Sequence, residues 1–122
     1  MSKYYEWDKF KYIYLEDSFV LEVKESEKEI SFTIDAVLTE KHPMYSSPRQ
    51  GEQYCYKKAK IVFKNLKNNK WLERNSISFT DADGHKDYGN IDSFELSSEG
   101  YHLLGDWGEV IICSEPPNLE WL

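Results

Sequence analysis

The feature that most constrains the fold is a run of alternating side chains at residues 30–39. Apolar residues occupy every second position, namely Ile30, Phe32, Ile34, Ala36 and Leu38. Most of the residues between them are small and polar or acidic. Because successive side chains of a strand point to opposite faces, this pattern predicts a β-strand with one face on a core. Phe19, Leu21 and Val23 form a second alternation, and the charged residues 25–29 lie between the two. The simplest arrangement is a hairpin.

The rest of the chain has the pattern of short strands separated by turns. Further strands are predicted at 55–63, 71–72, 77–79, 94–96, 101–104 and 110–113. Residues 10–15 are also predicted to be extended, although Tyr4, Trp7 and Phe10 would share one face of a short helix. Residues 40–53 contain two prolines and a glycine and are predicted to be the longest loop.

Turn signals recur along the chain at the spacing of about 8–12 residues that is typical of sandwiches and barrels. No long segment keeps the 3.6-residue periodicity of a helix. We therefore predict an all-β, single-domain antiparallel β-sandwich or barrel-like fold with about seven to nine short strands. A chain of 122 residues is long enough for one core and too short for two ordinary domains, so residues 1–122 are expected to form one β domain.

Two observations predict a cytoplasmic protein. The first residues lack the apolar stretch of a secretory signal, and the longest apolar run, 110–113, is far shorter than the roughly 20 residues that cross a bilayer. Cys55 and Cys113 stand far apart with no Cys-x-x-Cys pair, as expected for reduced thiols. We expect both cysteines to be small core residues and not nucleophiles or metal ligands.

The negative charge of the chain is concentrated in its C-terminal third. Residues 81–122 contain ten acidic side chains and one lysine, whereas residues 1–80 contain 14 basic and 12 acidic ones, so the net charges are -9 and +2. A cluster of like charge repels itself and weakens the fold slightly. Such a cluster suggests a role in binding or in solubility.

Residues 81–92 are the best candidate for a cation site. Counted from Asp81, acids fall at positions 1, 3, 7 and 12, a pattern that resembles an EF-hand loop. It departs from that pattern because Lys86 replaces the glycine at position 6, His85 stands at position 5, and position 12 is Asp92 and not glutamate. The simpler interpretation is that Asp-Gly and Gly-Asn turn a β connection.

The sequence favours a protein without catalytic activity or a cofactor. His42, His85 and His102 lie in no catalytic or metal-binding motif, and the chain has no nucleophile elbow and no glycine-rich phosphate loop. Cys55 and His42 would form a catalytic pair only if the fold brought them together. No metal ligand set is assigned.

One basic stretch, at residues 57–74, lies among aromatic side chains and resembles a track for a nucleic-acid backbone. A net charge of -7 opposes binding to a polyanion, so these lysines are interpreted as a solvated strand face that deters edge-to-edge aggregation. We therefore expect no nucleic-acid partner, and no membrane partner either.

Trp107 lies between Gly105 and Gly108 and beside Asp106 and Glu109. A tryptophan in this setting would anchor a partner, with the acids as polar guides. Alternatively, the glycines let strands bend closely while Trp107 fills the core.

The leading hypothesis is a small acidic binding module that masks a basic protein partner. Its expected contact residues are Asp81, Asp83, Asp87, Asp92, Asp106, Trp107 and Glu109, with Glu95 as a further acid of the same region. In length, acidity and lack of catalytic motifs the chain resembles bacterial immunity proteins that neutralise nuclease toxins. This resemblance rests on gross properties and on no shared motif.

Three alternatives remain open. The chain would be a small-ligand-binding or hydrolytic β-barrel if Tyr54, Tyr56, His102 and Trp107 lined one cavity. It would be a calcium-binding domain if residues 81–92 held a cation. It would be a structural subunit if its aromatic residues formed a homodimer interface, so both a monomer and a homodimer are compatible with the sequence.

Overall fold

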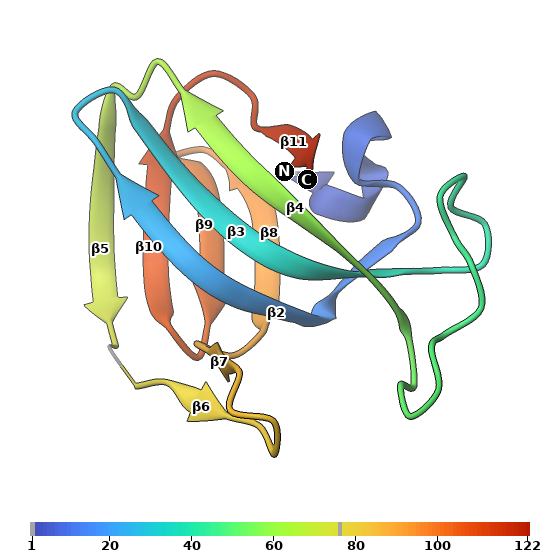
Figure 1. Ribbon diagram of the computed structural model, residues 1–122. Helices are drawn as coiled ribbons and strands as arrows, with labels where there is room; N and C mark the ends of the chain where they lie inside the picture. Colours follow the sequence, from blue (N-terminus) through green and yellow to red (C-terminus); the bar gives the residue numbers. More distant parts are fainter. Residues whose placement is uncertain (1, 76) are drawn as a thin grey trace.

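The computed structural model describes residues 2–75 and 77–122. Two antiparallel sheets face each other, and a small hairpin projects at one end (Figure 1). Within the described residues there is no α-helix, and the strands do not close into a barrel. The predicted antiparallel all-β fold is confirmed.

The four-stranded sheet has the order β11-β4-β3-β2 and comprises β2 (Ile13–Glu25), β3 (Glu29–Leu38), β4 (Cys55–Lys64) and β11 (Asn118–Trp121). The five-stranded sheet has the order β1-β8-β9-β10-β5 and comprises β1 (Ser2–Lys3), β5 (Asn68–Arg74), β8 (Ile91–Ser97), β9 (Gly100–Gly105) and β10 (Gly108–Cys113). The projecting hairpin consists of β6 (Phe79–Thr80) and β7 (Lys86–Asp87). Of these eleven described strands, β1, β6 and β7 have two residues each.

The predicted alternation in β3 forms the centre of the core. The five apolar side chains of this alternation, Ile30, Phe32, Ile34, Ala36 and Leu38, are each at most 2% exposed. They face the inward side chains of the other sheet, among them Phe94, Leu103, Val110 and Ile112. Removal of this apolar surface from water is the main force that holds the two sheets together.

The N-terminal segment closes one end of the core. It forms two short 3-10 turns, Tyr4–Glu6 and Asp8–Phe10, before β2 begins. The prediction of extended structure over 10–15 therefore holds only from Ile13. The single short helix of the alternative is replaced by these two turns, with Trp7 in an extended conformation between them. The ring of Phe94 lies 5.1 Å from that of Trp7 and 5.6 Å from that of Phe10, both edge to face.

A bulge interrupts β2 in its first half. Tyr14 pairs with Val37 and Phe19 pairs with Asp35, so the four residues between them lie opposite a single residue of β3. The hydroxyl of Ser18 holds the bulge, because it accepts a 2.9 Å bond from the Val37 amide and donates a 2.8 Å bond to the Tyr14 carbonyl. Bulges re-aim side chains. This one brings Glu16 beside Asn90, which precedes β8, and Asp17 beside Tyr54, at the end of the 39–54 loop.

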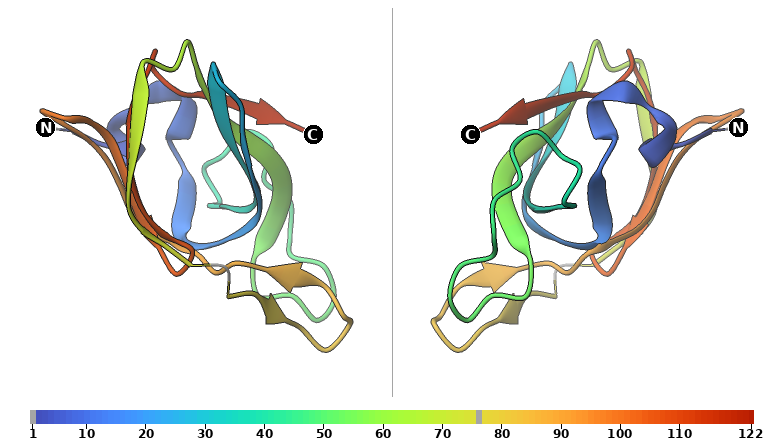
Figure 2. Two further views of the ribbon diagram at one scale, coloured as in Figure 1. Left: turned by 90° about the vertical axis from the view of Figure 1, so that its left-hand side faces the viewer. Right: turned by 90° about the vertical axis from the view of Figure 1, so that its right-hand side faces the viewer.

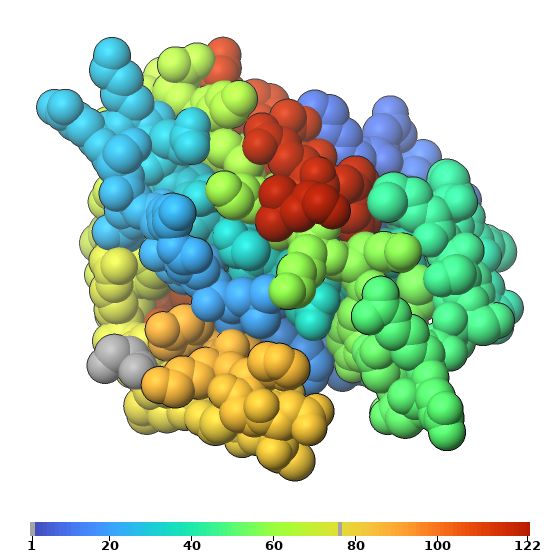
Figure 3. Space-filling model, in the orientation of Figure 1, coloured from blue at the N-terminus to red at the C-terminus, as the bar shows by residue number. Residues whose placement is uncertain are grey.

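Two segments project on the side of the four-stranded sheet, as Figure 2 shows. One is the 39–54 loop, and the other is the β6–β7 hairpin. In the space-filling view a notch separates them (Figure 3). No helix within the described residues is long and apolar enough to cross a membrane.

Candidate functional site

Three of the predicted contact residues come together at the end of the sandwich where the β6–β7 hairpin joins β8. The amide of Gly89 donates a 2.8 Å hydrogen bond to Asp87, and the side chain of Asp106 lies against the α-carbon of the same glycine. Asp92 lies at the start of β8, close enough to Asp106 for their charges to interact. We call this group, together with Glu16 of the β2 bulge, the acidic end.

The electrostatics of the acidic end are those of like charges without a counter-ion. Partial burial raises the pKa of Asp92, and the neighbouring charges of Asp106 and Glu16 raise it further. Among residues 2–75 and 77–122, none of the carboxylates of the acidic end forms an ion pair with lysine or arginine. The assembled strands thus concentrate negative charge at one place.

Trp107 belongs to the core and not to this surface. Its side chain is 3% exposed, lies 5.0 Å from the ring of Phe32, and donates a 3.0 Å hydrogen bond to the carbonyl of Asn90. The alternative interpretation of its flanking glycines is therefore the one that the structure supports. Trp107 fixes the β9–β10 turn that carries Asp106, and it is too deeply buried to contact a partner.

Glu109 lies apart from the acidic end. Its carboxylate is 2.6 Å from the Nε2 atom of His102 on the neighbouring strand, and both side chains are about three-tenths exposed. Glu95 pairs with His102 in the sheet register, so it lies on the same outward face of the five-stranded sheet. The predicted acidic patch is therefore not one surface: its residues are divided among the end of the sandwich, this outer face and the tip of the β6–β7 hairpin.

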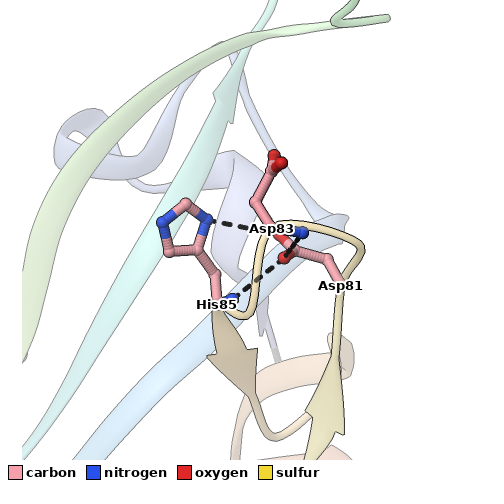
Figure 4. A group of neighbouring side chains, drawn as sticks. All are labelled: Asp81, Asp83 and His85. Carbon is pink, nitrogen blue, oxygen red and sulfur yellow. Dashed lines mark hydrogen bonds and ion pairs between the residues drawn. The ribbon is translucent and has the colours of Figure 1, made fainter.

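Asp81 and Asp83 lie with His85 at the tip of the β6–β7 hairpin (Figure 4). The Oδ1 atom of Asp81 accepts 2.9 Å hydrogen bonds from the amides of Asp83 and His85, and Oδ2 is 3.4 Å from the His85 ring. The bond from the His85 amide is the main reason that the pKa of Asp81 is lowered. One potential ligand atom from each residue falls within 4.8 Å of the others, yet all three side chains are exposed. The turn accounts for the position of Asp81 without a cation.

The residues proposed for a barrel cavity do not share one. Tyr54 lies just before β4 and Tyr56 is the second residue of that strand. His102 lies on the outer face of the other sheet, and Trp107 lies between the sheets. Cys55 and Cys113 are free thiols; Cys55 is buried as expected, whereas Cys113 is only partly buried. In the basic stretch, Lys64 lies 3.7 Å from Glu120 and Arg74 lies 3.0 Å from Glu25, so part of its charge is neutralised within the chain.

Sequence reasoning missed the carboxylates that surround the hairpin and the loop. Asp17 accepts a 2.8 Å hydrogen bond from the hydroxyl of Tyr54. Burial raises the pKa of Asp35, and the charge of Lys58, which lies opposite it in the β3–β4 ladder, lowers it. The sequence hides the bulge, because Ile13, Leu15, Phe19, Leu21 and Val23 keep the period of two across it. The structure instead buries Val20 and leaves Phe19 36% exposed, so the predicted inward face of Phe19 is wrong.

Comparison of the chain with protein-family models, with curated proteins and with solved structures finds no match in any of the three. The function is therefore inferred from the chemistry of the surface alone.

Proposed function

We propose that the protein is a small non-enzymatic binding module that meets a basic protein partner through its acidic end. The observation that carries this proposal is the grouping of Asp92, Asp106 and Glu16 with no lysine or arginine paired to any of them in the described chain. A basic partner would supply the missing counter-charge. Complementary fields of this kind accelerate encounter and fix orientation.

The exposure of these carboxylates supports binding over catalysis. Catalytic carboxylates usually lie in a cleft beside a nucleophile, a base or an electrophilic group. Asp92 and Asp106 instead lie on open surface, on a strand and in a turn that the core holds firmly. A rigid scaffold that presents exposed charge is suited to recognition of another protein.

The partner class that we favour is a protein with a basic surface built for phosphates, such as a nuclease. An array of carboxylates can occupy such a surface in place of the nucleic-acid backbone. This choice of partner extends the resemblance of the chain to immunity proteins in length and acidity.

The test uses two double variants with equal changes of net charge. Asp92→Asn/Asp106→Asn alters the acidic end, and Glu95→Gln/Glu109→Gln alters the outer face of the five-stranded sheet. Wild type and both variants are immobilised and exposed to an extract of the host cells, and bound proteins are eluted with increasing salt and identified by mass spectrometry. We expect one basic protein to be retained by wild type and by the outer-face variant, to be lost from the acidic-end variant, and to elute as ionic strength rises.

The same proteins retained equally by all three, or retained independently of salt, would contradict the proposal. Loss only from the outer-face variant would move the binding surface to Glu95 and Glu109.

A further inference from the structure

A pocket of about 300 Å³ lies between β2, the end of β3 and the 39–54 loop. Three tyrosines, Tyr14, Tyr45 and Tyr54, form part of its wall. The buried side chains of Val37 and Leu38 also line it. Glu40 is the one charged residue in this lining, so within the described chain the pocket combines aromatic rings with negative charge.

Asp17 adds a second carboxylate next to the wall. The hydroxyl of Tyr54 donates a 2.8 Å hydrogen bond to its Oδ2 atom. The phenol is a neutral donor at physiological pH, and this bond raises its pKa above the ordinary value of 10.0. Donation to a carboxylate also increases the electron density of the ring, which strengthens its attraction for a cation. Among residues 2–75 and 77–122, Asp17 forms no ion pair with lysine or arginine.

This combination selects among possible occupants. A cation over a tyrosine ring is attracted by the ring quadrupole, and nearby carboxylates add to that attraction. An anion would be repelled by Glu40 and Asp17, and a purely apolar ligand would leave the polar groups of the wall without partners. The long aliphatic stem of a lysine or arginine side chain also suits the apolar floor.

We infer that the pocket takes a cationic side chain, arginine or lysine, of the basic partner, with Tyr54 and Tyr14 against the charged head and Asp17 and Glu40 as counter-charges. This inference rests on the proposed function and assigns a specific anchor to it. The acidic end would attract the partner at long range, and the pocket would fix its position. Asp17 adjoins Glu16 in sequence, so the β2 bulge connects the two surfaces.

The test titrates isotope-labelled protein with three blocked tripeptides, acetyl-Gly-X-Gly-amide, in which X is arginine, lysine or the neutral arginine isostere citrulline. Amide chemical shifts report where each peptide binds. We expect arginine or lysine to shift the amides of residues 37–39 and 45–54 in a saturable way, and citrulline to bind about tenfold more weakly. Asp17→Asn and Tyr54→Leu should each weaken binding of the cationic peptide severalfold. Tyr5→Phe, an exposed tyrosine outside the pocket, should leave it unchanged.

The outcomes separate this inference from the proposed function. Equal binding of citrulline, or no saturable shift with either cationic peptide, would overturn the cationic pocket even if the acidic end captures a basic protein. Shifts confined to the neighbourhood of Asp92 and Asp106 would also overturn the pocket and would support the acidic end alone. The wild-type comparison of arginine with citrulline decides the question even if a variant fails to fold.

Discussion

The carboxylate of Asp106 lies against the α-carbon of Gly89, where any β-carbon would overlap it. Gly89 has a φ of +92°, a conformation that side-chain-bearing residues rarely adopt. The glycine is therefore required twice, once by the backbone and once by the close approach of Asp106. This contact joins the connection between the hairpin and β8 to the β9–β10 turn.

Gly89→Ala should destabilise the protein by about 3 kcal/mol, the sum of left-handed strain and steric overlap. Urea unfolding measures the loss. Gly84→Ala is the matched control, because its φ of +84° is similar while nothing lies within 4 Å of the added β-carbon. We expect that control to lose about 1 kcal/mol. Equal losses in the two variants would show that the contact with Asp106 is unimportant.

Asp92→Asn should make the protein more stable at pH 7. The pKa of Asp92 in the folded state is raised above 3.8, so the folded protein binds the proton more tightly than the unfolded chain does. Stability is therefore lost as pH rises from 3.8 through the folded pKa, and the ionised carboxylate opposes folding above it. Because Asp92 is exposed, we expect a gain of at most about 1 kcal/mol.

Unfolding by urea at a series of pH values from about 3 to 7 tests this expectation. Glu27→Gln, in the exposed turn between β2 and β3, controls for the simple loss of one negative charge. A constant difference between Asp92→Asn and wild type across the whole pH range would contradict the assigned repulsion.

Phe94→Ala should cost about 3–5 kcal/mol, since the cavity left behind cannot be filled by its neighbours. The side chain is 2% exposed and stacks or packs edge to face with four rings, those of Tyr4, Trp7, Phe10 and Phe63. Leu104→Ala serves as the control, because that side chain is 37% exposed on the outer face of the same sheet. Urea unfolding should show a loss of about 1 kcal/mol or less for the control. Similar losses in both variants would contradict the placement of Phe94 at the centre of the core.

The strands of the core could be predicted because burial on one face imposes a period of two. Residues 30–38 therefore revealed β3, whereas 110–113 indicated most of β10 as a short continuous apolar run. β11 was missed because its four residues follow two prolines and are only partly buried, so their side chains alternate weakly. Its existence depends on tertiary pairing, in which Trp121 lies opposite Ala59.

The site was predictable only in part, for a similar physical reason. The excess of acid after residue 80 is visible in the sequence, and Asp87, Asp92 and Asp106 do come together. Glu16 and Asp17 are far away in the chain and reach this region through a bulge and through strand pairing. Local patterns contain no information on such distant contacts.

Asp81→Ala should loosen the tip of the β6–β7 hairpin and leave the core intact. The carboxylate of Asp81 is the acceptor for two backbone amides, and those bonds lower its pKa below 3.8. They are therefore present above pH 3.8 and are lost as pH falls through the lowered pKa. At pH 7 the alanine variant should exchange the amide protons of Asp83 and His85 faster than wild type does.

Two control variants test the role of the Asp81 acceptor. Asp81→Asn, which keeps an acceptor oxygen, should retain most of the protection, and Asp83→Ala should retain the protection of His85. Amide-resolved hydrogen exchange measures these rates. Unchanged rates in Asp81→Ala would show that the hairpin turn forms without this side chain.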